Sequence, residues 1–355
     1  MYTILITGGC GFVGSNLAIL LKSKYPTYNI ICLDNLKRRG SELNLRRLFD
    51  QEIKFIHADI RIKEDLQIQE HIDFIIDAAA EPSVLAGTQT GIDYLINTNL
   101  TGTINTLHLA VKNNAKLIFL STSRVYAVNS LQQINYTESD TRFEISKIQS
   151  LQGVCNHGVN ELFPVNQSRS LYGATKLASE LLIQEFEAFF GLKYVVNRCG
   201  VIAGPHQMGK VDQGVVALWL ARHYWKKPVT YIGFGGKGKQ LRDVLHINDL
   251  FDLIDHQLHN FQVVKSQTFN AGGGTDCCIS LKELTDLCRL VSGNKVGETC
   301  ILENRKADIP LYVTDNGRLS GVTGWRPVRK MQDVVADTFS WLNENESQLT
   351  QIFNS

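Results

Sequence analysis

The stretch Thr7-Gly8-Gly9-Cys10-Gly11-Phe12-Val13-Gly14 decides the fold of this chain. It follows the short apolar run Tyr2–Thr7 and opens a helically spaced stretch, Gly14–Lys24. In the spacing G-x-x-G-x-x-G, the first glycine allows a tight turn and the second lets the backbone approach a pyrophosphate. The third lets the helix pack against the sheet. With the partial positive charge of a helix N-terminus beside it, this loop predicts a dinucleotide site.

Outward from this loop, short apolar runs alternate with longer helical patterns. Strands are predicted at Asn29–Leu33, Lys54–His57, Phe74–Ala78, Lys116–Ser121 and Tyr194–Cys199. Long helices are predicted at Tyr94–Asn113 and Tyr172–Phe190. Nearly continuous apolar strands that alternate with helices are typical of a parallel sheet covered on both faces. The predicted fold class is therefore α/β, a Rossmann-like doubly wound parallel sheet.

A length of 355 residues suggests two domains. The first is predicted at 1–204, with a C-terminal helix near Met331–Asn343 that returns to it. The second, at 205–330, is a smaller mixed α/β domain with a hairpin near Tyr231–Asp243 and helices near Asp249–Leu258 and Ser280–Ser292. Within the first domain, Val128–Ser168 is a long and polar excursion from the regular pattern. Loops of that length inside a compact domain are usually functional.

The composition excludes several classes of protein. The chain has 36 Lys+Arg against 35 Asp+Glu, a net charge of +1, so no basic surface for nucleic acid or an anionic membrane is expected. No apolar run approaches the roughly 20 residues of a membrane helix, and the N-terminus does not resemble a secretory signal. The eight cysteines contain no C-x-x-C pair, so no metal site is predicted. These features favour a reduced, cytoplasmic compartment.

Two acidic residues lie where the adenosine half of a dinucleotide would bind. Asp34 follows the second strand, where a carboxylate accepts both ribose hydroxyls, and this favours NAD over NADP. The basic triplet 37–39 (Lys37, Arg38, Arg39) offers the alternative of a 2′-phosphate site, or of a solvated turn. Asp59-Ile60, after the third strand, is placed to reach the adenine, although Asp59 as a turn former explains the position nearly as well.

The predicted catalytic pair is Tyr172 with Lys176. Four residues apart on a helix, the two side chains share one face. An ammonium nearby stabilises phenolate, so Tyr172 can act as a general base, and Lys176 can donate to the nicotinamide ribose. The run Ser121–Tyr126 ends the fifth strand, at the edge where such sheets bind ligand. Its Thr122 is predicted to hydrogen-bond the reacting oxygen, with Ser123 as the closest rival and turn formation as the alternative.

Together these residues resemble the extended short-chain dehydrogenase/reductases that modify nucleotide sugars. The resemblance covers nearly the whole chain. It is carried by the Gly8–Gly14 loop, Asp34, Asp59, Asn99, Ser121–Tyr126, Tyr172–Lys176, Arg242–Leu250 (similar to R-D-(F/V)-x-x-V-x-D) and Gly324–Pro327 (G-W-x-P). Two departures stand out. Ala78-Ala79-Ala80-Glu81 replaces the usual H-L-A-(A/G), and Ala127 stands where glycine usually follows V-Y.

Within that group the chain most resembles the CDP-paratose 2-epimerases, through Ile6–Asn16, Val211–Gly214 and Gly238–His246. The resemblance implies that NAD stays bound while Tyr172 takes the proton from the sugar C2 hydroxyl, and that the keto sugar turns before hydride returns. It also implies a homo-oligomer, dimer or tetramer. The implied cofactor-binding residues are Gly8, Gly11, Phe12, Val13, Gly14, Asp34, Asn35, Asp59, Ile60, Ala78, Ala80, Asn99, Tyr172 and Lys176.

A CDP-sugar needs cationic partners for its diphosphate. Arg242 and Arg305 are the predicted partners, because a guanidinium fork matches phosphate oxygens, and Lys239 is a candidate at the rim. The remaining candidates for contact with the nucleotide or sugar are Gln213, Ser123 and Arg124.

Two other functions stay open. A nucleotide-sugar 4-epimerase or 4,6-dehydratase would have the same fold, but dehydratases usually carry an acidic pair after the strand-five Thr, where Ser123-Arg124 stands here. A non-catalytic NAD-binding interaction protein should have lost Tyr172 or Lys176.

Overall fold

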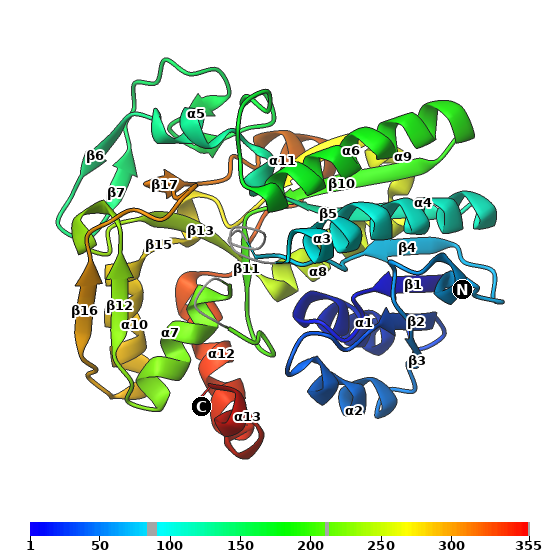
Figure 1. The fold of residues 1–355 in the computed structure, drawn as a ribbon, viewed down its shortest axis with the longest axis horizontal. Coiled ribbons are helices and arrows are strands. Elements are labelled where there is room, and N and C mark those ends of the chain that lie inside the picture. Colours follow the sequence, from blue (N-terminus) through cyan, green and yellow to red (C-terminus); the bar gives the residue numbers. More distant parts are fainter. Residues whose placement is uncertain (84–90, 210–212, 354–355) are drawn as a thin grey trace. The chain divides into compact units, whose positions relative to one another are not determined.

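A computed structural model describes residues 1–83, 91–209 and 213–353, and its central feature is a seven-stranded sheet (Figure 1). The strand order is β14-β10-β5-β4-β1-β2-β3. The strands are β1 Thr3–Thr7, β2 Asn29–Asp34, β3 Lys54–His57, β4 Phe74–Asp77, β5 Lys116–Thr122, β10 Lys193–Cys199 and β14 Gln267–Ala271. The pairs β1–β2, β1–β4, β2–β3 and β4–β5 are parallel, which confirms the predicted fold class.

Helices cover this sheet on both faces (Figure 1). They are α1 Phe12–Lys24, α2 Asn44–Phe49, α3 Ile92–Ile96, α4 Gly102–Asn113, α6 Leu171–Phe190, α8 Ile247–His259 and α9 Phe261–Val264. Alternate residues of the strands point to opposite faces, so Leu5, Ile75 and Phe119 meet Leu107 of α4 and Ile183 of α6 in one buried cluster. Burying each such side chain contributes roughly 1.5–3 kcal/mol, which ties α4 and α6 to the sheet.

The helix predicted over Tyr94–Asn113 is present but not regular. Its middle, Asn97–Thr101, is a π-helical segment between α3 and α4. A π-helical turn inserts one extra residue, and such turns are frequent at functional sites. Here the turn places Asn99, which is fully buried, toward the sheet end.

The rest of the described chain builds smaller sheets and helices. Its strands are β6 Tyr136–Glu138, β7 Phe143–Ile145, β8 Val154–Cys155, β9 Gly158–Val159, β11 Val201–Ala203, β12 Val229–Ile232, β13 Leu241–His246, β15 Cys278–Ser280, β16 Glu298–Ile301 and β17 Leu311–Tyr312. Its helices are α5 Val128–Gln132, α7 Val215–Tyr224, α10 Leu281–Ser292, α11 Gly317–Thr323, α12 Met331–Glu344 and α13 Glu346–Phe353. The predicted helices near 249–258, 280–292 and 331–343 are confirmed by α8, α10 and α12.

The hairpin predicted near Tyr231–Asp243 is wrong. β12 pairs in parallel with β16, whereas β13 joins β11, β15 and β17 in a different sheet. The connecting segment contains four glycines with positive φ, Gly233, Gly235, Gly236 and Gly238. Such glycines permit turns of several kinds, so the partners of both strands are decided by segments far along the chain.

The described chain divides into two compact units. The first contains Met1–Val125, Leu171–Arg198 and Phe251–Phe269, and the second contains Tyr126–Ser170, Cys199–Leu250 and Asn270–Ser355. This division differs from the predicted boundaries at 204 and 330, because the excursion and α12 belong to the second unit and 251–269 to the first. In the second unit, the Val159 N–H donates to the Val313 carbonyl, and α12 packs on α7 and α10.

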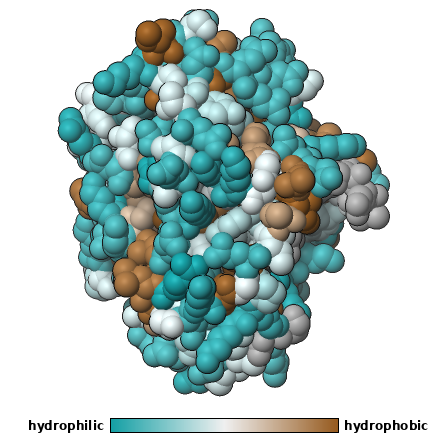
Figure 2. All heavy atoms as spheres, turned by 90° about the vertical axis from the view of Figure 1, so that its left-hand side faces the viewer, coloured by the Kyte–Doolittle hydropathy of each residue, from teal (hydrophilic) through white to brown (hydrophobic). Residues whose placement is uncertain are grey.

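The surface carries isolated apolar side chains in a mostly hydrophilic background, as the face in Figure 2 shows. Among residues that the structure describes, no helix is both long and apolar enough to cross a bilayer.

Candidate active site

The Gly-rich loop leaves no room for side chains. Gly8 has φ +66°, and a Cβ on it would lie 2.9 Å from the Ala79 Cα. A Cβ on Gly14 would lie 2.2 Å from the Gly8 carbonyl oxygen, closer than any real contact. The Gly11 N–H closes the turn by donating to the same carbonyl at 2.9 Å. The loop is therefore a bare backbone cradle at the carboxyl end of β1.

Helix α1 starts directly from this cradle. No described side chain caps it at Gly11, and its first turn contains no acidic residue. Phe12 and Val13 begin the helix and are half-buried. The N–H groups of a helix N-terminus and the helix dipole favour an anion at this point, so the cradle could hold a pyrophosphate.

Asp34, the last residue of β2, faces the same loop. Its carboxylate accepts hydrogen bonds from the Cys10 N–H at 3.0 Å and the Leu36 N–H at 2.8 Å. Burial raises the pKa of Asp34, and these N–H donors oppose that rise. The bonds fix the carboxylate at the strand end, where the adenosine ribose of a dinucleotide would lie.

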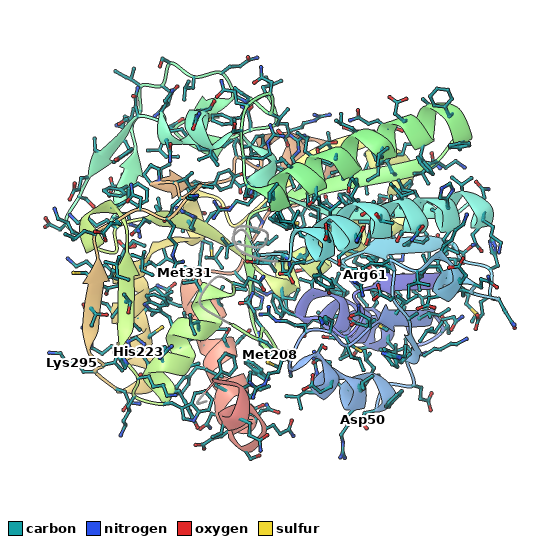
Figure 3. The ribbon with its side chains drawn as sticks, in the orientation of Figure 1. Asp50, Arg61, Met208, His223, Lys295 and Met331 are labelled. Carbon is teal, nitrogen blue, oxygen red and sulfur yellow. The ribbon has the colours of Figure 1, made fainter. Side chains whose placement is uncertain are left out.

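A second acidic residue organises the neighbouring strand end. Asp59 accepts from the Asn35 side chain at 2.9 Å and from the Arg61 guanidinium, whose Nη2 lies 2.6 Å from Oδ2. Arg61 lowers the pKa of Asp59 to about 2. The Arg61 guanidinium, labelled in Figure 3, also lies 4.9 Å from the centre of the Tyr94 ring. Ile60 is buried beside it, with its carbonyl accepting from Asn105.

Asn99 joins the segment after β4 to helix α6. Its Oδ1 accepts the Glu81 N–H at 2.8 Å, and its Nδ2 donates to the Glu81 carbonyl and to Thr175 Oγ1, at 3.1 and 3.2 Å. Ala78 and Ala80, in the same segment, are half-buried. The π-helical turn thus positions an amide that holds the segment after β4 against α6, the helix of the predicted catalytic pair.

The catalytic candidates lie on α6 and at the carboxyl end of β5. Tyr172 and Lys176 lie in the first two turns of α6, which packs on β5 and on the turn Ser123–Val125. Lys176 is buried, and its Nζ donates to the Leu120 carbonyl at 2.9 Å. Thr122 lies two residues further along β5. The structure therefore brings the lysine to the end of the strand that carries the predicted hydroxyl.

The hydroxyl of Thr122 is oriented by its own turn. Its Oγ1 accepts the Arg124 N–H at 3.2 Å. A hydroxyl that accepts one N–H can still donate its proton, as the predicted role requires. Ser123 and Arg124 follow in the turn and are both half-buried.

Four predicted substrate residues, Gln213, Lys239, Arg242 and Arg305, lie in the second unit, whereas Ser123 and Arg124 lie in the first. Lys239 Nζ is 2.8 Å from Glu138 Oε1 and 2.6 Å from the Ser139 carbonyl, so it is tied to the β6–β7 hairpin. Arg242 donates to Asp308 at 3.1 Å and to the Ile309 carbonyl at 2.8 Å. Arg305 and Gln213 are half-buried. Val211 and Asp212, part of the resembling stretch, lie outside the described residues.

Three buried charged residues of the first unit are not predicted from the sequence. Glu180 and Arg198 form an ion pair with 2.7 Å between Oε2 and Nη2, and Asp77 is fully buried at the end of β4. Glu180 carries a usable signal, because it is four residues after Lys176 and so shares its helix face. Asp77 carries none, because it stands near the carboxyl end of the predicted strand Phe74–Ala78, where polar residues are common.

Known proteins resemble this chain over nearly its full length. The model of the family described as "NAD dependent epimerase/dehydratase family" matches residues 4–272. The CDP-paratose 2-epimerase of Salmonella typhi is 31% identical over 351 residues, 95% of this chain and 98% of the relative. A putative UDP-glucose 4-epimerase of Methanocaldococcus jannaschii is 26% identical over 96% of this chain and 99% of its own.

Solved structures share the fold. The UDP-glucose 4-epimerase of Thermotoga maritima, with UDP-glucose, superposes with a TM-score of 0.76 at 22% identity and covers 97% of this chain and 99% of its own. The dTDP-glucose 4,6-dehydratase of Bacillus anthracis, in complex with NAD, gives 0.76 at 22% identity and covers 98% of both chains.

Proposed function

Because the chain belongs to the NAD-dependent epimerase/dehydratase family, we propose that it inverts C2 of a CDP-linked deoxyhexose and converts CDP-paratose to CDP-tyvelose with a resident NAD. The observation that carries the proposal is the pair Tyr172 and Lys176 on α6, held at the end of β5 in the same unit as the Gly-rich loop. The 31% sequence identity with the CDP-paratose 2-epimerase of Salmonella typhi supports the choice of substrate.

The residues of the first unit fit this cofactor. The bare cradle of Gly8, Gly11 and Gly14 and the uncapped start of α1 would hold the pyrophosphate, and Asp34 would accept the adenosine ribose hydroxyls. Asn35, Asp59 and Ile60 would border the adenine, with Ala78, Ala80 and Asn99 forming the wall beside the nicotinamide half. Bound NAD supplies a hydride acceptor that is also the later hydride donor.

The protein's own contribution is proton transfer and orientation. Tyr172, as phenolate, takes the proton of the C2 hydroxyl, and the Lys176 ammonium stabilises that phenolate. Thr122 donates a hydrogen bond to the reacting oxygen and keeps it beside Tyr172. After the 2-keto sugar has turned its other face, Tyr172 returns the proton to the same oxygen. One tyrosine therefore serves as base and then as acid.

The second unit would bind the nucleotide diphosphate through Arg242 and Arg305. Asp308 holds Arg242 at 3.1 Å and belongs to the same connection between β16 and β17 as Arg305. This ion pair anchors the segment that carries Arg305, so both guanidinium groups would act as one diphosphate site. Gln213, Ser123 and Arg124 would contact the nucleotide or the sugar, and Lys239 would hold the β6–β7 hairpin at the rim.

A second candidate is a nucleotide-sugar 4-epimerase or 4,6-dehydratase, which relatives at about 26% identity favour by their names. Against a dehydratase stands Ser123-Arg124, in the place where such enzymes usually carry an acidic pair. Without an acid at that turn, the C5 proton and the C6 hydroxyl have no dedicated catalyst there.

The test is to incubate purified protein with CDP-paratose, CDP-glucose and UDP-glucose and to follow C2 and C4 by NMR. We expect inversion at C2 of CDP-paratose. In D₂O the product should carry no deuterium at C2, because the hydride leaves and returns within one active site. Inversion at C4 would instead establish a 4-epimerase, a ketone at C4 with loss of the C6 hydroxyl would establish a 4,6-dehydratase, and no change in any sugar would overturn both candidates. Acid release of the cofactor should give NAD and not NADP.

Two further properties belong to this proposal. We infer a cytoplasmic homo-oligomer, dimer or tetramer, which uses neither nucleic acid nor a membrane as partner. Light scattering coupled to size-exclusion chromatography gives the oligomeric mass, and a monomer at micromolar concentration would contradict it.

A further inference from the structure

Asp77 is an ionisable residue at a position where burying its charge is energetically unfavourable. It ends β4, whose four residues are all buried, and none of its own surface is exposed. An ionised carboxylate in such a place needs hydrogen bonds or an opposite charge. Its neighbours therefore indicate what Asp77 does.

The strand registers put Asp77 in a row of three side chains. Thr7 of β1 and Phe119 of β5 are its partners on the two adjacent parallel strands. Partners in register point to the same face of a sheet, here the face that packs against α4 and α6. The Thr7 hydroxyl donates to Asp77 Oδ1 at 2.6 Å. One oxygen of the carboxylate is thus fixed by the strand that leads into the Gly-rich loop.

Lys176 enters this row from α6. Its Nζ lies 4.4 Å from the centre of the Phe119 ring and 2.9 Å from the carbonyl of Leu120, the next residue of β5. The ammonium is therefore at the level of the Asp77–Phe119 pair, and its side chain is 2% exposed. Burial raises the pKa of Asp77, and the Lys176 charge opposes that rise most strongly.

The second carboxylate oxygen, Oδ2, is buried and has no hydrogen-bond partner within the described residues. The nearby Thr103 hydroxyl faces the carboxylate, but it donates its proton to the Asn99 carbonyl at 2.8 Å. Glu180, one turn beyond Lys176, is committed to Arg198 and Ser121. The Lys176 ammonium lies against Phe119, the in-register neighbour of Asp77, and so brings a positive charge beside the row that contains this carboxylate.

We propose that Asp77 is the counter-ion of Lys176 and a positioning residue for proton transfer by Tyr172. It keeps the buried lysine protonated, and that charge then stabilises the Tyr172 phenolate. Thr7 links the pair to the wall of the site, because its Oγ1 also accepts the Ala79 N–H at 3.3 Å. The inference rests on the proposed function for its catalytic meaning, whereas the ion pair itself concerns only the folded protein.

The ion pair is tested by urea unfolding of Asp77→Asn, Lys176→Met and the double variant. Each single variant leaves one buried charge without its partner, so both should unfold more easily than the wild type. The equilibrium constant for unfolding of the double variant should be about tenfold smaller than the value that two independent effects predict. Additive effects within about twofold would overturn the ion pair.

A matched control uses Asp73, at the other end of β4, whose carboxylate accepts the Thr3 N–H. Asp73→Asn combined with Lys176→Met should be additive. If Asp77→Asn does not fold, Thr7→Val takes its place in the cycle, because it removes the hydroxyl that donates to Asp77 and leaves the carboxylate in place. It should couple to Lys176→Met in the opposite sense, because the double variant leaves the buried carboxylate with neither partner, and additivity would overturn the proposal.

The positioning role has a readout that a structural role would not move. In Asp77→Asn the lysine loses its counter-ion and deprotonates more easily, so the alkaline limb of kcat/KM should move to lower pH by about one unit or more. An unmoved limb would overturn the positioning role. If no substrate is turned over, the proposed function fails while the unfolding cycle still decides on the ion pair.

Discussion

Glu180 of α6 and Arg198 of β10 form an almost fully buried ion pair, with 2.7 Å between Glu180 Oε2 and Arg198 Nη2. Ser121 of β5 donates to the other oxygen of the same carboxylate. The network joins α6, β5 and β10. Its Ser121 directly precedes Thr122, and its Glu180 lies one helical turn after Lys176. It therefore sets where α6, and with it the predicted catalytic pair, lies along β5.

Removing one partner of this pair should destabilise the protein strongly. Arg198→Met leaves the Glu180 carboxylate buried without its countercharge, at a cost of roughly 3–5 kcal/mol in the free energy of unfolding. Urea unfolding measures it. The double variant Glu180→Leu with Arg198→Met should recover a large part of the loss, because no buried charge remains. A single-variant loss below about 1 kcal/mol would show that the pair is not as buried as described.

Tyr172→Phe should retain the fold and the cofactor and lose turnover. A general base contributes about 10²- to 10⁴-fold, so C2 inversion followed by NMR should slow by that factor. Tyr136→Phe is the control, because this tyrosine lies on the β6–β7 hairpin with 38% of its surface exposed. Equal rates for the two variants would contradict the role of Tyr172.

Gly14→Ala should disturb the cradle. The new Cβ would lie 2.2 Å from the Gly8 carbonyl oxygen, so the backbone must shift. We expect a loss of about 1–3 kcal/mol in stability and loss of NAD from the purified protein, read from its absorbance after acid release. Gly321→Ala, on α11, has nothing within 4 Å of its Cβ and should keep both. Full NAD content in Gly14→Ala would contradict the assignment of the loop.

Asp243 should make stability depend on pH. Burial raises the pKa of this fully buried carboxyl from its ordinary 3.8 to about 6 in the folded protein. Because the folded-state value is the higher one, Asp243 favours folding at low pH, and this contribution is lost as pH rises through the window up to about 6. The difference corresponds to about 3 kcal/mol between the two ends of the window.

Asp243→Asn cannot ionise, so its unfolding free energy should lack this decline. Urea unfolding of both proteins at about pH 4 and 7 gives the comparison, and the other titrating groups cancel between them. Parallel pH profiles of the two proteins would show that Asp243 keeps an ordinary pKa.

The sequence predicts much of the first unit because its signals are local. Apolar runs such as Lys116–Ser121 become strands within one residue of the predicted bounds, since a strand buried on both faces must be apolar along its length. Tyr172 and Lys176 are recognisable because helical spacing alone puts them on one face. The glycines of the loop are recognisable because only glycine fits there.

Other features are decided by partners far along the chain. Nothing in Gly233–Gly238 says that β12 will pair with β16, some 70 residues away, instead of with the next strand. The π-helical turn at Asn99 cannot be predicted from the sequence either. Asn99 contacts Glu81 and Thr175, which lie 18 and 76 residues away along the chain. From the sequence, Arg242 and Lys239 are predicted to bind the substrate diphosphate. In the structure Arg242 forms an ion pair with Asp308, and Lys239 forms one with Glu138.

The sequence by itself indicated the parallel sheet, from the alternation of apolar runs with helical patterns. It also indicated the glycine loop and the shared helix face of Tyr172 and Lys176, because each depends on spacing within one stretch of chain. Only the tertiary structure decided which charges are buried together. Asp77, Glu180 and Arg198 lie on separate strands and a helix, and an ion inside a protein depends on its neighbours in space. That is why the buried Glu180–Arg198 pair, and the place of Asp77 in the strand row next to Phe119, are known only from the fold.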